Sequence, residues 1–449
     1  MRIKTAYPIT MDLINEDIPE DNITCSRASI SYISTDTREL CAQDLYFALS
    51  GSRFDGEDFI PDATYRGALS VGRSEGASIR VRDPGQTLLG LAHRYKRAFF
   101  QKPTVAITGS VGKTTVKDLT ASILSKKYKV HATKGNLNNE IGLPMTILSA
   151  AADTDAMILE MGMNHRGEIR RLSLCAEPSL SVITCIGTAH IGNLGSRDAI
   201  AEAKSEILDG MVQKSVLIPH GEELLTNLPG ARTVSTTDPS ADHFLQIISK
   251  GRDTVTVRYF SERIKTDAIC LPSPGIHFPT CLAFAISVAD IMDLSREDIE
   301  SALGDLNYGG RLIVLPQLTI LNDCYNASCE SVRSALGSLS YYDKRSALLG
   351  NMLELGEFTA DMHLDIGRAA AECRLEYLYL IGEFSEYIKE GAVSGGMSPD
   401  RILINADSSR PDISAEQIIS TANGETILFK ASRGMHLETV INIIKDYFD

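Results

Sequence analysis

A strand, a glycine turn and a helix start follow one another at 104–128, and this combination constrains the fold more than any other stretch. Residues 104-TVAIT-108 are apolar and β-branched, as in a buried strand. After the turn 109-GSVG-112, apolar residues recur at helical spacing over 113–128. A strand that enters a helix through a tight turn predicts an α/β unit built on a parallel sheet.

The turn itself is typical of a phosphate-binding loop. Its backbone N–H groups and the helix start point at one place, where the helix dipole also favours an anion. Lys113 would supply a positive charge for the β- and γ-phosphates, and the Thr114 hydroxyl a Mg²⁺ ligand. The usual pattern has four residues between its glycines, whereas only Ser110 and Val111 stand between these. A chance Gly-Lys-Thr is the plainer alternative, but the flanking strand and helix favour nucleotide binding.

Composition excludes several classes of protein. A chain of 449 residues has room for two to four domains, and a formal net charge of −14 argues against a broad nucleic-acid-binding face. The 9 cysteines include no C-x-x-C pair, which indicates reduced thiols inside the cell. The start lacks a signal-peptide core, and Asp290 interrupts the most apolar run, 281–292. We therefore expect a cytoplasmic protein without a nucleic-acid or membrane partner.

The order of expected strands and helices divides the chain into three α/β domains. Residues 1–100 mix short apolar runs with turn residues and form a small module. Residues 101–309 alternate strands with helices, which predicts a parallel sheet covered on both faces. Residues 310–449 alternate again, so they form a Rossmann-like unit, although they contain no G-x-G-x-x-G dinucleotide motif.

Three further residues are candidates for a metal-dependent site. Glu160 ends one expected strand, His190 follows another, and Lys204 lies on a helix. A carboxylate and an imidazole near a triphosphate could hold a second Mg²⁺ ion. The plainer interpretations are a carboxylate in a salt bridge, a loop histidine bonded to backbone, and a solvated helix lysine. The residues alone thus indicate an enzyme that uses ATP and Mg²⁺, and they leave its substrate open.

Further stretches lie in order along nearly the whole chain, among them 34-STDTREL-40, 135-GNLNNEIGLPMT-146, 159-LEMGMNHRGEI-169, 189-AHIGNLGSRDAIAEAKSEI-207 and 430-KASRGMHLE-438. With the short loop G-x-x-G-K-[ST], they resemble the Mur ligase family, the ATP-dependent amide-forming enzymes of peptidoglycan assembly. Residues 325-YNA-327 and 352-MLELGE-357 most resemble the member that joins D-alanyl-D-alanine to a UDP-N-acetylmuramoyl-tripeptide.

This resemblance implies an ATP site between the central and C-terminal domains. Lys113 would hold the β/γ-phosphates and Thr114 the first Mg²⁺ ion, while Glu160 and His190 would bind a second. Lys204 matches a lysine that CO₂ carbamylates in several family members, which turns a cation into a Mg²⁺ ligand. Arg311 would reach the γ-phosphate. The implied cofactor-binding residues are Gly109, Ser110, Val111, Gly112, Lys113, Thr114, Thr115, Asp323, Tyr325 and Asn326.

The resemblance also implies where the acceptor binds and how it reacts. The UDP-N-acetylmuramoyl-tripeptide would lie along the N-terminal domain, and its carboxylate would be activated as an acyl phosphate before D-Ala-D-Ala attacks. The implied substrate-binding residues are Ser34, Thr35, Asp36, Arg38, Phe54, Asp55, Gly56, Asn138 and Asn139. We expect a monomer, and the third residue of the tripeptide, lysine or diaminopimelate, stays open.

Some positions depart from the family pattern. Phe278 stands where an asparagine near adenine is expected, and Asn351 replaces the aspartate of a Gly-Asp-Met segment. The alternatives are a Mur-type ligase that adds another amino acid and a catalytically silent protein of the same fold. The first is disfavoured by 325–327 together with 352–357. The second is disfavoured because the implied catalytic residues Lys113, Thr114, Glu160, His190, Lys204 and Arg311 are all present.

Overall fold

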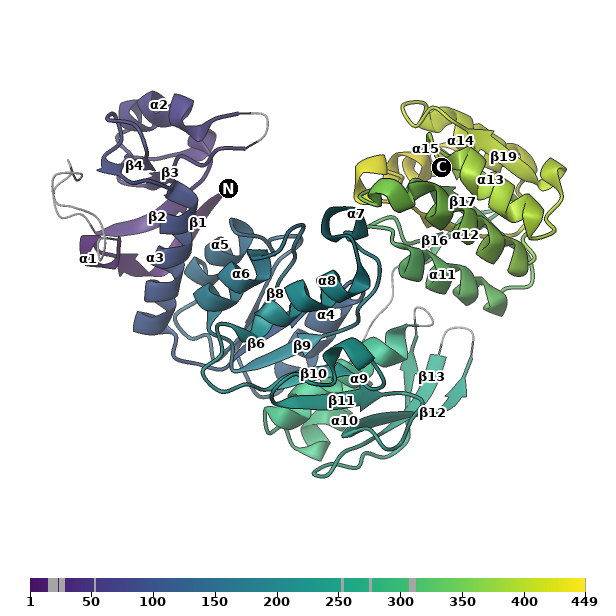
Figure 1. Cartoon of the computed structure of the whole chain (residues 1–449), viewed down its shortest axis with the longest axis horizontal. Helices are drawn as coiled ribbons and strands as arrows, with labels where there is room; N and C mark the ends of the chain where they lie inside the picture. The colour runs from purple at the N-terminus through teal and green to yellow at the C-terminus, as the bar shows by residue number, and fades with distance from the viewer. Residues whose placement is uncertain are drawn as a thin grey trace.

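The computed structural model describes residues 1–14, 23, 29–51, 54–251, 254–273, 277–306 and 312–448. Three sheets follow one another along the chain, with five, nine and six strands (Figure 1). Helices cover them, so the predicted α/β fold class is confirmed. The predicted domain boundary near residue 100 falls between the end of a helix at Phe99 and the start of a strand at Thr104. The predicted boundary at 309/310 lies outside the described residues.

The first sheet carries one antiparallel strand on an otherwise parallel set. Its strands, in spatial order, are β1 (Arg2–Ile9), β2 (Ile30–Ser34), β3 (Leu45–Phe47), β4 (Leu69–Gly72) and β5 (Ile79–Arg80). Helix α3 (Pro84–Phe99) starts at Asp83, whose carboxylate accepts hydrogen bonds from two backbone amides of the first turn. It buries Leu88 and Tyr95, and it packs between this sheet and the helices of the central part (Figure 1).

The central sheet is parallel from β7 to β12 and ends in two antiparallel strands. Its order is β14 (Ile269–Pro272), β13 (Thr254–Phe260), β12 (His243–Lys250), β11 (Ala231–Ser235), β10 (Val216–Pro219), β9 (Leu180–Ile183), β6 (Thr104–Thr108), β8 (Ala156–Glu160) and β7 (Val130–Ala132). Strand β6 pairs with β8 on one side and β9 on the other. The carboxyl ends of these three strands therefore meet at one edge, where open α/β sheets bind their ligands.

Both faces of the central sheet are buried, because alternate residues of each strand point to opposite sides. Val105 and Ile107 of β6 lie in one apolar cluster with helices α4 (Lys113–Leu124), α9 (Phe278–Ile291) and α10 (Arg296–Gly304). Ala106 lies in the other cluster, with α5 (Gly142–Leu148), α6 (Glu168–Ala176) and α8 (Arg197–Ser205). The strand at 104–108 is continuously apolar because helices cover it on both faces.

The third sheet repeats the same construction. Its order is β15 (Leu312–Val314), β16 (Thr319–Asn322), β20 (Thr426–Lys430), β17 (Arg345–Gly350), β18 (Leu378–Ile381) and β19 (Ile402–Asn405), and only β15 is antiparallel to its neighbour. Helices α11 (Cys329–Ser338), α12 (Thr359–Glu372) and α13 (Ser385–Ser394) cover one face. Helices α14 (Pro411–Thr421) and α15 (Glu438–Phe448) cover the other.

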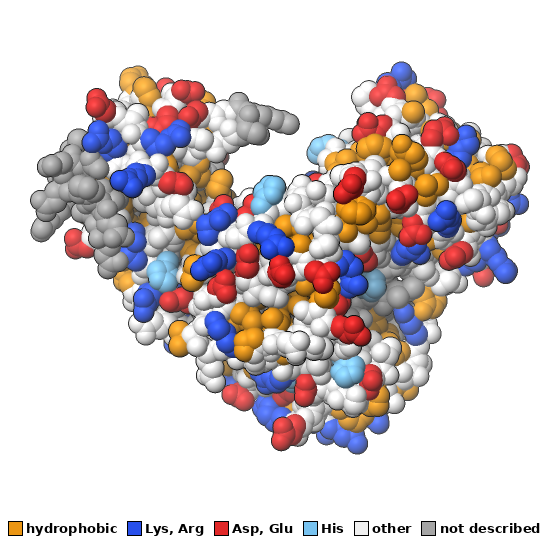
Figure 2. Space-filling view, in the orientation of Figure 1, with side chains coloured by type: hydrophobic (Ala, Val, Ile, Leu, Met, Phe, Trp, Pro, Cys, Tyr) orange, Lys and Arg blue, Asp and Glu red, His pale blue; other side chains and the backbone are white. Residues whose placement is uncertain are grey.

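The first and third parts stand apart above the central part, and Figure 2 shows a wide recess between them. None of the helices in the described part of the chain combines the length and the apolarity needed to cross a membrane.

Candidate active site at the phosphate loop

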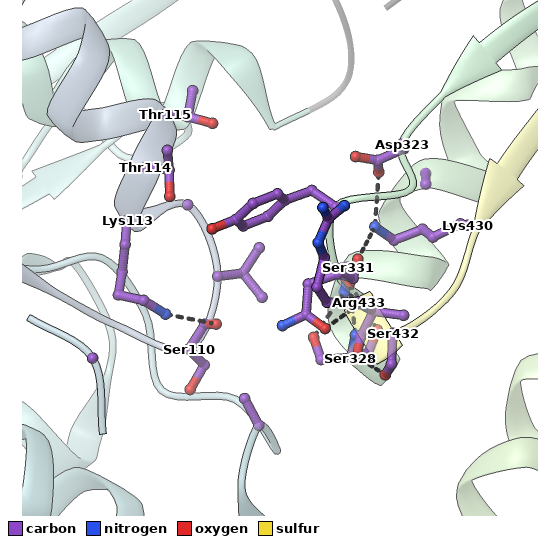
Figure 3. A pocket seen from close by; sticks show the side chains of 18 of the residues that line it. Ser110, Lys113, Thr114, Thr115, Asp323, Ser328, Ser331, Lys430, Ser432 and Arg433 are labelled. Atoms are coloured by element: carbon purple, nitrogen blue, oxygen red, sulfur yellow. Dashed lines mark hydrogen bonds and ion pairs between the residues drawn. The ribbon is translucent and has the colours of Figure 1, made fainter. Parts of the chain in front are cut away.

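The loop after β6 requires glycine at both of its ends. Gly109 and Gly112 have φ of +147° and +87°. A Cβ atom on Gly109 would lie 1.9 Å from Oγ1 of Thr184, which follows β9. Lys113 folds back over the loop, and its Nζ donates to the Gly109 carbonyl at 2.7 Å. It also donates to Ser110 O at 3.4 Å (Figure 3). Burial lowers the pKa of Lys113, and the nearby Glu160 carboxylate opposes that shift. This arrangement places a cation at the glycine turn where α4 begins, as a phosphate site needs. The amides of Ser110 and Val111 donate to O and Sγ of Cys185.

Glu160 provides a buried negative charge beside the loop. It ends β8 and is 1% exposed. Its two oxygens accept hydrogen bonds from Oγ1 of Thr114 at 2.9 Å and from Nδ2 of Asn138 at 2.8 Å. Both donors are neutral, and Glu160 has no ion pair among the described residues, so the salt-bridge interpretation is not what the structure shows. A buried carboxylate without a cation partner is suited to receive one.

Among the described residues, the ring of His190 bonds to a carboxylate and not to backbone. It precedes the short helix α7 (Ile191–Leu194) and has φ of +66°, in the left-handed region. Its Nδ1 lies 2.6 Å from Oε2 of Glu354, a residue of the C-terminal part. The hydrogen bond from His190 holds the pKa of the Glu354 carboxyl below its ordinary value. The plainer interpretation of this histidine is therefore wrong, and its partner comes from another domain.

Lys204 is buried, which rules out a solvated helix lysine. It is 1% exposed on α8, and its amine has neither a hydrogen bond nor an ion pair within the described residues. Burial, together with the nearby charge of Lys113, lowers the pKa of Lys204 to about 7. A substantial fraction of the amine is thus neutral near neutral pH, and the neutral form is the one that can react with CO₂.

The C-terminal part faces the phosphate loop with a cluster at the ends of β16 and β20 (Figure 3). Nζ of Lys430 lies 2.8 Å from Oδ2 of Asp323 and donates to the carbonyl of Asn326 at 2.8 Å. Tyr325 is 52% exposed, and the guanidinium of Arg433 stands 5.9 Å from its ring centroid. Lys430 is 3% exposed, so its ion pair fixes the loop that carries Tyr325.

A cavity of about 620 Å³ lies between these two groups of residues. Of the predicted cofactor-binding residues, all except Gly109 line it, and so do Glu160 and His190. Phe278, which replaces an expected asparagine, lines it as well. Lys204 is not part of the lining, and Arg311 lies outside the described residues. The structure therefore brings together most of the predicted nucleotide and metal site.

The predicted substrate residues of the N-terminal part are not brought to this cavity. Ser34 ends β2, and the ion pair of Asp36 with Arg38 follows it directly. Asp55 accepts from Ser50 at 2.7 Å and pairs with Arg73 at 2.7 Å, next to Phe54, which is 59% exposed. The parallel strands β2 and β3 end side by side here, so these residues form a separate cluster across the recess.

The two asparagines predicted to bind substrate have structural roles. Asn138 donates to Glu160 as described above, and its carbonyl accepts from Gly162 N at 2.8 Å. Oδ1 of Asn139 accepts from the backbone amides of Ile141 and Gly142, at the start of α5. Both side chains also line the cavity.

Sequence reasoning missed Lys430, Arg433 and Glu354 as residues that line the cavity. A lysine that ends the apolar strand 426-TILFK-430 was a usable signal, because a buried lysine needs a partner. Glu330 accepts from Thr188 N at 2.7 Å, and like Glu354 it bonds to the central part from the C-terminal part. The resemblance included Glu354 in 352–357 but gave it no role, because the partners of Glu330 and Glu354 lie more than a hundred residues away.

Over nearly its full length, the chain is similar to named ligases and to a solved ligase structure. The Mur ligase middle domain family matches residues 107–289. A UDP-N-acetylmuramoyl-tripeptide–D-alanyl-D-alanine ligase of Bacillus subtilis is 35% identical over 91% of this chain and 92% of that protein. A ligase of the same name from Synechocystis is 34% identical over 92% and 91%. A crystal structure of MurF from Acinetobacter baumannii superposes with a TM-score of 0.86 at 26% identity, covering 98% of this chain and 100% of that one.

Proposed function

This chain belongs to the Mur ligase family, and on that premise we propose that it joins D-alanyl-D-alanine to a UDP-N-acetylmuramoyl-tripeptide with ATP. The observation that carries the proposal is the cavity in which the phosphate loop, Glu160 and His190 face the Asp323–Lys430 pair. A cavity shared by two domains can bind a nucleotide from both sides. Two relatives with this ligase name, from Bacillus subtilis and Synechocystis, match nearly the whole chain, which supports the dipeptide as the added group.

The proposed reaction has two chemical steps. The terminal carboxylate of the tripeptide attacks the γ-phosphorus of ATP, the bond to the β,γ-bridging oxygen breaks, and ADP leaves with that electron pair. The amine of D-Ala-D-Ala then attacks the acyl carbon, and the tetrahedral intermediate expels phosphate and loses the amine proton. The reactants are anions in the first step, so the chain must neutralise charge and hold them in line. Lys113, at the start of helix α4 directly after the glycine turn, is placed for that task.

The residues present fit a Mg²⁺ ion. Thr114 and Glu160 offer hydroxyl and carboxylate oxygens 2.9 Å apart, and His190 keeps one ring nitrogen free of the Glu354 bond. The described residues bring no three His, Cys, Asp or Glu side chains together, which agrees with Mg²⁺ taking further ligands from phosphate and water. When bound, Mg²⁺ would polarise the phosphate oxygens and screen their charge.

We further propose that Lys204 is carbamylated in the active enzyme. It is buried, its amine has a lowered pKa, and none of the described residues pairs with it. Without modification, the Lys204 amine and Lys113 are two nearby groups that both favour a positive charge. A carbamate would replace the Lys204 amine by a negative group. The chain would then offer a second carboxylate-like group in addition to Glu160.

The rest of the proposal concerns the domains. Residues 1–100 bind the UDP-linked substrate through the cluster around Ser34 and Phe54, residues 101–309 bind ATP, and residues 310–449 form the Rossmann-like domain. Because the recess separates the first cluster from the cavity (Figure 2), the domains must approach for the tripeptide carboxylate to reach ATP. The chain acts as a monomer in the cytoplasm, where ATP is available, and size-exclusion chromatography tests the monomer.

The deciding experiment is phosphate release from ATP and Mg²⁺, with each acceptor omitted in turn. Release that needs both a UDP-muramoyl-tripeptide and D-Ala-D-Ala supports the proposal, and lysine- and diaminopimelate-containing tripeptides are compared in the same assay. Release with a single amino acid in place of the dipeptide would point to another Mur-type ligase. Release indifferent to both acceptors, or none under any condition, would leave a nucleotide-binding or silent protein of the same fold.

A further inference from the structure

A contact between two domains holds the ring of His190. Its Nδ1 lies 2.6 Å from Oε2 of Glu354, which follows β17 of the C-terminal sheet. Both residues have positive φ, +66° for His190 and +65° for Glu354. Such backbone is uncommon outside glycine, so it persists where the surroundings demand it. The two strained residues face one another.

The backbones around this pair fit closely. Gly192 N donates to the carbonyl of Glu354 at 3.2 Å. A Cβ atom on Gly192 would lie 2.6 Å from N of Gly356 and 2.7 Å from O of Glu354. The segment 190–192 and the segment 354–356 therefore dock without room for a side chain between them. This docking sets the position of the Glu354 carboxylate relative to the imidazole.

The bond determines which ring nitrogen of His190 is free. An ionised carboxylate only accepts hydrogen bonds, so Nδ1 must carry the hydrogen. In the neutral ring the lone pair is then on Nε2. Histidines that bind metals commonly donate their other ring N–H to a carboxylate, which fixes the tautomer and the ring orientation. His190 and Glu354 both line the cavity that contains Thr114 and Glu160.

We propose that Glu354 is a positioning residue of the active site. When the C-terminal domain docks, its carboxylate takes the Nδ1 hydrogen of His190 and leaves Nε2 available to a divalent cation beside the phosphate loop. The assembly of the metal site thus depends on the arrangement of two domains. The inference builds on the proposed function for what the site catalyses, but the hydrogen bond and the tautomer belong to the protein without metal or substrate.

The first test reads the tautomer directly in the metal-free protein. Two-bond ¹H–¹⁵N correlation spectra of ¹⁵N-histidine-labelled chain report which ring nitrogen carries the hydrogen, and a His190→Gln sample assigns the signal. We expect the Nδ1–H form in the wild type and a loss of that form in Glu354→Ala. Glu354→Gln should restore part of it, because the amide oxygen still accepts a hydrogen bond. Glu357→Gln is the matched control, since Glu357 is exposed on the same segment and has no partner among the described residues.

The second test separates docking from chemistry. Gly192→Ala places a methyl group against the Glu354–Gly356 backbone, so it should shift the His190 signal as Glu354→Ala does while leaving the carboxylate in place. In the phosphate-release assay, Glu354→Ala should raise the Mg²⁺ concentration for half-maximal rate ~10–100-fold, the range found for partners of metal ligands. Glu357→Gln should leave that concentration unchanged.

The outcomes distinguish this inference from the proposed function. If the His190 tautomer in Glu354→Ala equals that of the wild type, or if His190 carries its hydrogen on Nε2 in the wild type, the inference is overturned even where ligase activity is present. A tautomer that depends on Glu354 and on Gly192 supports it even where the acceptor tests fail. A changed tautomer with an unchanged Mg²⁺ requirement would also contradict it, because the bond would then be structural only.

Discussion

At the residue scale, the phosphate loop depends on the absence of a side chain at Gly109. The φ of +147° disfavours any other residue, and Oγ1 of Thr184 occupies the place of a Cβ atom at 1.9 Å. Thr184 itself donates to the carbonyl of Val111. Thr184 therefore contacts the loop at both Gly109 and Val111, so a side chain at residue 109 would displace the whole loop.

We therefore expect Gly109→Ala to weaken ATP binding at least tenfold and to lower the free energy of unfolding by about 1–3 kcal/mol. Isothermal titration calorimetry and denaturant unfolding measure the two effects. Gly221→Ala is the control, because Gly221 also has positive φ, +81°, but a Cβ atom there would have no neighbour within 4 Å. Equal ATP affinity in Gly109→Ala and wild type would mean that the loop does not hold the phosphates.

The buried amine of Lys204 gives a second prediction at this scale. Lys204→Ala should lose most of the ligase rate, and short-chain carboxylic acids should restore part of it, because an added carboxylate can occupy the place of the carbamate. Lys113→Ala is the control, since its missing group is a cation that no acid replaces. If the acids restore no activity to Lys204→Ala, the proposed carbamate loses its simplest support.

At the scale of elements, strand β12, strand β13 and helix α9 share a buried polar network. Nδ1 of His243 lies 2.6 Å from Oη of Tyr259, whose hydroxyl donates to Asp290 at 3.0 Å, and Arg263 pairs with Asp290 at 2.7 Å. Burial lowers the pKa of His243 to about 4, despite the nearby Asp290 charge. The sequence predicted strands alternating with helices over 101–309, but nothing in it indicated this network.

The network predicts how stability depends on pH. Between its folded pKa of about 4 and an unfolded value of ~6.5, His243 binds more protons in the unfolded chain. The contribution of His243 to the free energy of unfolding is therefore fully present above pH ~6.5. It falls by about 3 kcal/mol as the pH drops toward 4. Urea unfolding at several pH values checks this. The decrease in unfolding free energy should be smaller in His243→Gln than in the wild type. It should be unchanged in His436→Gln, where the replaced histidine is exposed. An equal decrease in the wild type and both variants would refute the prediction.

At the scale of the whole molecule, a few contacts between domains hold the C-terminal part on the central part. Glu330 of α11 accepts from the Thr188 amide at 2.7 Å, and its Oε2 is buried with no hydrogen bond in the described part of the chain. A hydrogen bond to a charged group contributes about 1.5–3 kcal/mol. Loss of the Glu330–Thr188 hydrogen bond is enough to change the equilibrium between arrangements in which the C-terminal part is docked on the central part or separated from it.

Glu330→Ala should therefore shift the chain toward an undocked arrangement. We expect a larger radius of gyration by small-angle X-ray scattering in the absence of nucleotide, and a partial return when ATP and Mg²⁺ are added. Glu383→Ala, at an exposed residue of the same domain, is the control. Identical scattering from both variants and the wild type would show that Glu330 does not hold the domains together.

The sequence by itself determined the α/β class, the succession of three α/β units and the phosphate loop with the strand that ends at Glu160. Each depends on short-range patterns: apolar strands at 104–108 and 156–160, glycines at 109 and 112, and a Gly-Lys-Thr helix start. A strand buried on both faces must be continuously apolar, and a loop that holds phosphate must expose its amides. Local physics therefore makes these elements readable.

Only the tertiary structure decided which groups those residues meet. Lys204, Glu160 and His190 each had a plainer interpretation, and burial or a partner removed it. Burial of a helix lysine depends on what packs over it, and the Glu354 partner of His190 comes from a different sheet. The separation of the Ser34 and Phe54 cluster from the cavity likewise depends on how domains are placed. Contacts across domains follow from the packing of whole surfaces, which no local pattern of residues records.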